Sequence, residues 1–183
     1  MRPVAGVTYS AIQLPIAIGT NHKTIQHMLQ RIQSVYLLLA GLLIFALFLF
    51  PVAHNVYINS VPSTISVTGV YQDVNGVQAH TQSFVALIAG TAIVGVLPFI
   101  LIFLYKNRKQ QIRMTAYSIV AEVAFIATLV MRVTNLSKLV PPPSSGSYWI
   151  GSVLPVIALV LLFMAIMGIR RDDKLVKSVD RLR

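Results

Sequence analysis

The sequence predicts an all-α membrane protein, a bundle of four transmembrane helices with a small extracytoplasmic β-hairpin loop. Hydrophobic residues make up 56% of the 183 residues and only 11% are charged, whereas soluble domains carry about 25% charged residues. Four long apolar stretches recur, at about 32–53, 84–105, 114–131 and 148–169. Basic residues flank these stretches, so we interpret the net charge of +10 as a sign of membrane orientation instead of nucleic-acid binding.

Residues 1–27 contain two prolines and two glycines and no long apolar core. This composition predicts a disordered N-terminal tail. An alternative is that translation begins at Met28, so that the first 27 residues are not part of the native protein. From Met28 a short polar and basic entry leads into the first predicted span, 32–53.

The loop after the first span, residues 54–83, contains no Lys or Arg and one acid, Asp73. Asn75-Gly76 lies between two runs rich in Val, Thr and Tyr. An Asn-Gly pair between such runs is a strong signal for a two-residue hairpin turn. We therefore expect a small β-hairpin over the helix ends.

The short loop after the second span, 84–105, is strongly basic. Its basic residues are Lys106, Arg108, Lys109 and Arg113. Short loops with this bias stay on the cytoplasmic side. An arrangement with both termini cytoplasmic places 13 of the 15 Lys and Arg residues inside, and leaves only Arg132 and Lys138 outside.

The third span, 114–131, holds one acid near its middle, Glu122. Its residues span roughly 27 Å at about 1.5 Å per residue, close to the hydrocarbon thickness of a bilayer. Glu122 is therefore expected at the membrane midplane. Ser118 and Thr115 precede it by four and seven residues and share its helical face. Because a central acid costs about 2.5 to 3.5 kcal/mol on insertion, this face should point into the bundle.

Three roles are open for Glu122. In the first, Glu122 is a protonated hydrogen-bonding group that joins helices. Its partner would be Ser118, a hydroxyl such as Thr91 or Ser152, or a backbone carbonyl. Alternatively, it is a proton or cation site in a small transporter, or it pairs with a charge on another protein's membrane helix. No Lys, Arg or His lies in any other span and no inverted repeat is evident, which weakens the transporter interpretation.

The last part of the chain contains a Pro- and Ser-rich turn, the interfacial anchors Tyr148 and Trp149, the fourth span, and a basic end, 170–183. We expect the end to continue the fourth helix into the cytoplasm. Basic residues beside a membrane contact anionic headgroups or a cytoplasmic partner. The residues expected to do so are Arg31, Lys106, Arg108, Lys109, Arg113, Arg170, Arg171, Lys174, Lys177, Arg181 and Arg183.

Two terminal motifs carry a family resemblance. Met28 to Tyr36 reads M-x-Q-R-I-Q-S-V-Y, and Asp180 to Arg183 reads D-R-L-R. With these motifs, Met28 to Arg183 resembles a bacterial inner-membrane family known only as a domain of unknown function, number 4293. The resemblance implies four spans and an inner-membrane location, and it supplies no activity. It favours a start at Met28, because the first 27 residues depart from the family pattern.

The sequence indicates no enzyme. It contains no H-E-x-x-H, no G-x-S-x-G, no Gly-rich phosphate loop and no paired carboxylates. It has no cysteine, which excludes disulfides and thiolate metal sites. We expect no metal site, because His54 and His80 have only Asp73 nearby, and no haem, because neither histidine lies in a span.

These observations predict a non-catalytic accessory or scaffold subunit of a larger membrane complex, with no cofactor. Its partners would be membrane lipid and a protein of that complex. Nucleic acid would be met only indirectly, through a ribosome, and no small-molecule substrate is evident. The alternative is a small proton-linked carrier or channel centred on Glu122.

Overall fold

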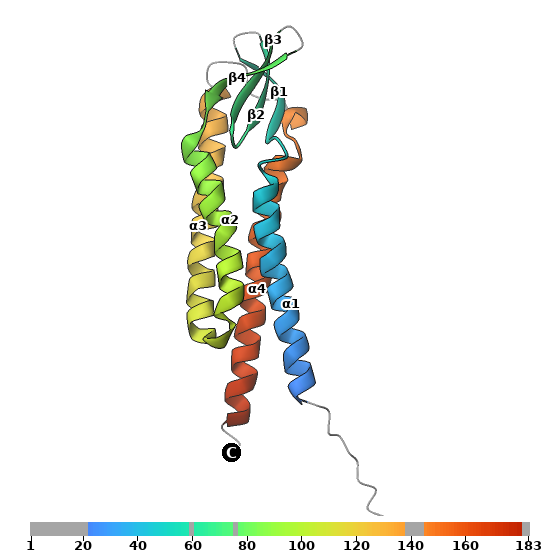
Figure 1. The fold of residues 1–183 in the computed structure, drawn as a ribbon, viewed down its shortest axis with the longest axis vertical. Helices are drawn as coiled ribbons and strands as arrows, with labels where there is room; N and C mark the ends of the chain where they lie inside the picture. The colour runs from blue at the N-terminus through green and yellow to red at the C-terminus, as the bar shows by residue number, and fades with distance from the viewer. Residues whose placement is uncertain (1–21, 59–60, 75–76, 138–144, 181–183) are drawn as a thin grey trace, which may run out of the picture.

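The computed structural model describes residues 22–58, 61–74, 77–137 and 145–180. In these residues, four helices run side by side along the long axis, and a four-stranded antiparallel sheet lies at one end of them (Figure 1). The helices are α1 (His22–Ala46), α2 (Val85–Phe103), α3 (Arg108–Ser137) and α4 (Ile150–Asp180), with the short 3-10 helices η1 (Leu104–Lys106) and η2 (Ser145–Ser147). The strands are β1 (Ala53–Ile58), β2 (Val61–Ser66), β3 (Gly69–Val74) and β4 (Val77–Ser83).

The prediction of an all-α bundle with four membrane spans is wrong. The chain forms a four-stranded sheet in addition to its helices. Three helical stretches in the described residues are long and apolar enough to cross a membrane: Val85–Lys106, Arg108–Leu136 and Ile150–Lys174. The apolar part of α1, Ile32–Ala46, is shorter; it covers roughly 22 Å of a hydrocarbon layer of about 30 Å.

The first predicted span divides into a helix and a strand. The helix ends at Ala46, and the next amides bond to carbonyls only three residues back, as in Leu47 N to Ile44 O at 3.1 Å. Pro51 then ends any helical path, because it has no N–H and disfavours helical backbone at the preceding residue. The run remains apolar up to Ala53, where β1 begins, because β1 is buried in the same core. Apolar composition therefore could not locate this boundary.

The sheet is a meander in the order β1-β2-β3-β4. The hairpin that Asn75-Gly76 predicts corresponds to the β3–β4 pair, whose partners nearest the turn are Val74 and Val77; the two turn residues lie outside the described residues. Strands β1 and β2 were not predicted from the sequence. Between β2 and β3 the chain turns back into Gly69, which has φ +154°. A Cβ there would collide with the backbone oxygen of Gln82, so this turn requires glycine.

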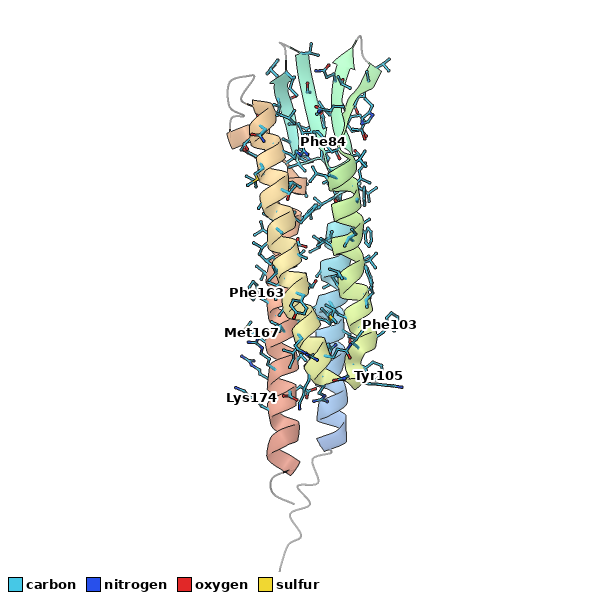
Figure 2. All side chains as sticks on the ribbon, turned by 90° about the vertical axis from the view of Figure 1, so that its left-hand side faces the viewer. Phe84, Phe103, Tyr105, Phe163, Met167 and Lys174 are labelled. Atoms are coloured by element: carbon cyan, nitrogen blue, oxygen red, sulfur yellow. The ribbon has the colours of Figure 1, made fainter. Side chains whose placement is uncertain are left out.

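The sheet and the nearby helix ends share one hydrophobic core. Ile65 and Val70 of the sheet are buried in the same cluster as Leu129 of α3 and Phe84. Phe84 lies where β4 leads into α2 (Figure 2). At Gly151, the first turn of α4 approaches the backbone of Pro51 so closely that a Cβ would collide with it. The sheet therefore packs directly against the helix ends and shares a hydrophobic core with them.

The outer surface of the helices is apolar. Ile93 of α2, Val120 of α3 and Val160 of α4 are exposed, and the side chain of Phe103 is 77% exposed. Phe103 and Phe163 project from the outside of the helices in Figure 2. Such large exposed apolar surfaces are rare on soluble monomers. Together with the three apolar helices, this surface indicates a membrane protein.

Three parts of the chain lie at the side of the bundle away from the sheet (Figure 1). They are the start of α1, the turn between α2 and α3, and the last turns of α4. We call this side of the bundle the basic end, because Lys106, Lys109 and Arg171 lie there. α1 begins at His22, inside the stretch 1–27 predicted as a tail, and residues 1–21 lie outside the described residues. α4 runs without interruption to Asp180.

Candidate functional site

A single buried stripe runs along α3. Its members are spaced three or four residues apart, as one helical face requires. They are Gln111, Thr115, Ser118, Glu122, Phe125, Leu129 and Val133. The stripe is polar from Gln111 to Glu122, at the basic end, and apolar from Phe125 onward, toward the sheet. The three residues that the sequence groups on one face, Thr115, Ser118 and Glu122, are all buried, with Glu122 0% exposed.

The first polar groups of this stripe are satisfied by backbone carbonyls. Thr115 Oγ1 donates to Gln111 O at 2.7 Å. Gln111 Nε2 donates to Leu101 O at 3.0 Å. Because Leu101 belongs to α2, this side chain joins α2 to α3 at the level where the two helices turn.

Ser118 and Glu122 differ from these groups. Among the described residues, Ser118 Oγ and both carboxylate oxygens of Glu122 are buried without a hydrogen-bond partner. The hydroxyls predicted from the sequence as partners donate to nearby backbone carbonyls instead, Thr91 Oγ1 to Leu87 O and Ser152 Oγ to Trp149 O, each at 2.7 Å. A buried carboxyl without a donor or a cation is costly. The position can therefore serve as a hydrogen-bonding group for a partner helix or as a proton site.

A second polar feature joins α3 to α4 at the basic end. Arg108 Nη1 lies 2.9 Å from Asp172 Oδ2, and the Arg108 side chain is 27% exposed. Asp172 is only 3% exposed. Its other oxygen, Oδ1, has no hydrogen-bond partner among the described residues. Asp172 Oδ2 therefore links α4 to α3 through an ion pair, whereas Oδ1 has no described donor.

Asp172 and Gln111 were not predicted as site residues from the sequence, and Arg108 was predicted to contact lipid or a partner. A usable signal was present in α4, where Leu162, Ala165 and Ile169 are buried at spacings of three and four. Asp172 follows Ile169 by three residues, so the same helical spacing places Asp172, and not Asp173, on the inner face. The pairing with Arg108 has no such signal, because it depends on how α3 and α4 align.

A family comparison gives the chain its place among known proteins. The family model described as Domain of unknown function (DUF4293) matches residues 29–182. The chain belongs to this family. The match confirms the family resemblance that the terminal motifs predict. Comparison with curated proteins finds no match, and neither does comparison with solved structures.

The range matched by DUF4293 includes every buried polar residue described above. It also includes most of the basic residues expected to contact lipid or a partner. Lys106, Lys109, Arg113, Arg170, Arg171 and Lys174 are exposed, and Arg108 is partly buried. The side chains of Arg31, Lys177, Arg181 and Arg183 lie outside what the structure describes.

The two histidines of the sheet region contact neighbouring side chains. His54 Nδ1 lies 3.1 Å from Thr64 Oγ1, and its ring meets that of Trp149 edge-on at 5.1 Å between centroids. The ring of His80 lies 4.9 Å from that of Tyr71. No group of three His, Cys, Asp or Glu side chains comes together in the described part of the DUF4293 chain.

Proposed function

We propose that this DUF4293 protein is a non-catalytic accessory or scaffold subunit of a larger complex in the inner membrane of a bacterium. In this proposal the basic end faces the cytoplasm and the sheet lies on the opposite side. The excess of Lys and Arg at one end of the bundle supports this orientation, since such residues remain on the cytoplasmic side.

One observation carries the structural role. The buried stripe of α3 is polar only between Glu122 and the basic end. Toward the sheet it continues with Phe125, Leu129 and Val133, all in the hydrophobic core. A carrier must expose its ion site to each side of the membrane in turn. A buried apolar face on one side of Glu122 supports a fixed hydrogen-bonding group that joins helices within the chain or between chains.

Two exposed surfaces support contact with partners. At the basic end, the exposed Lys and Arg side chains fit anionic lipid or a cytoplasmic partner such as a ribosome, or a translocation or respiratory assembly. At the other end, every residue of β4 is exposed along the edge of the sheet. Unpaired edge strands are common sites of protein contact. The proposal includes no small-molecule substrate, and nucleic acid only through a ribosome.

The second candidate function is a small proton-linked carrier or channel centred on Glu122. The observation that favours it is the absence, within the described residues, of any hydrogen-bond partner for both carboxylate oxygens. A carboxyl that no neighbour holds is available to take up and release a proton.

The experiment compares the wild-type chain with Glu122→Gln. Both carry a C-terminal tag, are purified from membranes in mild detergent and are examined by mass spectrometry for retained proteins. Glutamine keeps the shape and the hydrogen bonding of the side chain but cannot titrate. We expect a stoichiometric protein partner with both chains, at equal abundance.

Two results would favour the carrier instead. One is a wild-type chain that purifies as a monomer or homodimer. The other is proton flux in liposomes that Glu122→Gln abolishes while abundance and partner retention stay normal.

A further inference from the structure

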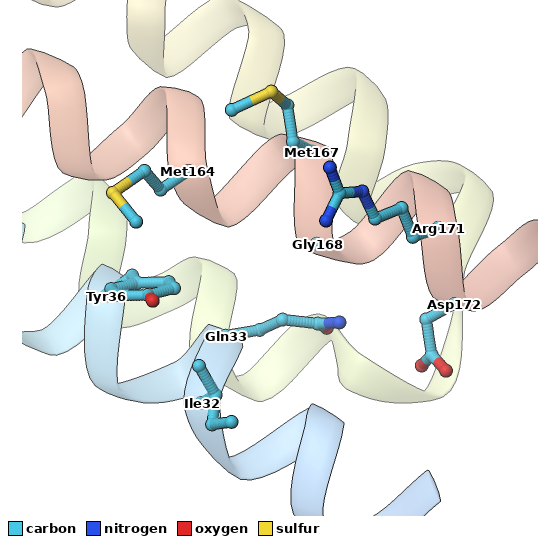
Figure 3. A pocket seen from close by; sticks show the side chains of 8 residues that line it. All are labelled: Ile32, Gln33, Tyr36, Met164, Met167, Gly168, Arg171 and Asp172. Carbon is cyan, nitrogen blue, oxygen red and sulfur yellow. The ribbon is translucent and has the colours of Figure 1, made fainter.

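A groove of about 320 Å³ lies between α1 and α4 near the basic end (Figure 3). Its lining comes from one turn of α1 and two turns of α4. The lining residues are Ile32, Gln33 and Tyr36 of α1, and Met164, Met167, Gly168, Arg171 and Asp172 of α4. The groove begins among the last apolar residues of α4 and ends at its first charged residues. In a membrane, this level of α4 therefore coincides with a lipid headgroup and the part of the acyl chains next to it.

One part of the groove is apolar and adaptable. Ile32, Met164 and Met167 are exposed along it, and the ring of Tyr36 lies beside Met164 in Figure 3. Methionine side chains are flexible and polarizable, so they adapt to irregular apolar ligands. This part matches an acyl chain better than it matches a polar metabolite.

The other part is polar and well built. Gln33 is only 8% exposed. It packs against Gly168 so closely that a Cβ there would lie 2.9 Å from Gln33 Cγ. Arg171 is exposed at the groove, whereas Asp172 is buried in its wall. Arg108 pairs with Asp172 Oδ2, and Asp172 Oδ1 is a buried acceptor without a hydrogen-bond partner among the described residues.

We propose that this groove binds one phospholipid with a primary-amine headgroup, phosphatidylethanolamine. The phosphate pairs with the Arg171 guanidinium, the ammonium donates to Asp172 Oδ1, and an acyl chain lies along Met164 and Met167. The headgroup carries one anion and one ammonium group that donates hydrogen bonds, which complements the one cation and the one unpartnered acceptor among the described residues of the groove. Phosphatidylcholine carries the same charges but has no N–H, and phosphatidylglycerol has no cation.

The proposal rests on the membrane orientation proposed above, but it does not require a protein partner. The test is native mass spectrometry of the full-length, delipidated chain with equal amounts of phosphatidylethanolamine and phosphatidylcholine that have identical acyl chains. We expect roughly tenfold preferential retention of phosphatidylethanolamine, the ratio that one charge-assisted hydrogen bond supplies. Co-purified proteins are scored in a separate experiment, so failure of the scaffold role and failure of the lipid site are distinguishable.

Three variants locate the site. Arg171→Gln should reduce retention of both lipids, whereas Arg132→Gln, an exposed arginine of α3 outside the groove lining, should change neither. Asp172→Asn should remove the preference for the primary amine. Equal retention of the two lipids by the wild-type chain overturns the proposal, as do equal losses in the two arginine variants. If Asp172→Asn does not fold, the wild-type ratio and the arginine pair still decide the question.

Discussion

Asp172 is an acidic residue that the fold buries. It lies 3% exposed on the inner face of α4, and its described cation partner is Arg108 of α3. Breaking a buried pair by removing one partner costs more than the pair contributes, because the remaining charge stays buried. Arg108 is therefore expected to matter for stability as well as for surface charge.

Substituting Arg108→Met should destabilise the fold by on the order of 2 kcal/mol, because a buried carboxylate oxygen loses its cation. Combining it with Asp172→Leu should recover most of that loss, since neither charge then remains buried. Thermal unfolding in a fixed detergent measures both effects. Lys109→Met, at an exposed neighbour, is the control. Equal shifts for Arg108→Met and Lys109→Met would contradict this account of the ion pair.

Among the elements, the sheet depends most on a single backbone position. Gly69 begins β3 with φ +154° and faces the backbone of Gln82 in β4. Only glycine adopts this conformation without strain. The turn therefore sets the alignment of β2, β3 and β4.

The substitution Gly69→Ala should destabilise the sheet by roughly 1 to 3 kcal/mol, the usual cost of a strained backbone position. Hydrogen–deuterium exchange should then accelerate in peptides covering 61–83 and remain unchanged in α3. The matched control is Gly146→Ala, because a Cβ at Gly146 meets nothing within 4 Å. Uniformly faster exchange in the helices as well would show that Gly69 acts on the whole fold instead of on the sheet.

At the scale of the whole molecule, the sheet and the basic end lie at opposite ends of the long axis (Figure 1). If the bundle crosses a membrane, the two ends face different compartments. The chain has no cysteine, so single introduced cysteines report accessibility without background.

In intact cells with the outer membrane permeabilised, an impermeant maleimide should label Gln78→Cys, in the exposed strand β4. It should label Lys109→Cys and Lys174→Cys, both at the basic end, only after the inner membrane is also opened. Labelling of Lys109→Cys together with Gln78→Cys in intact cells would refute the proposed orientation.

Much of the candidate site could be predicted from spacing alone. Thr115, Ser118 and Glu122 follow the helical period, and an acid in an apolar stretch is expected to face inward; all three are buried. Their hydrogen bonding could not be predicted, because the hydroxyls of Thr91 and Ser152 donate to backbone carbonyls three or four residues before them. Such bonds depend on side-chain rotamers and on helix alignment, which a pattern of residue types does not contain.

Composition, periodicity and local motifs are properties of the chain, so the three long apolar helices, the β3–β4 hairpin and the family could be predicted from the sequence. The end of α1 before the start of β1 at Ala53, and the pairing of four strands in one sheet, depend on tertiary packing and could not be predicted. Tertiary packing also decides that Arg108 meets Asp172. A helix and a strand that are buried in the same core are equally apolar, so composition does not separate α1 from β1. The ion pair joins residues far apart in the sequence, so it forms only when α3 and α4 pack together.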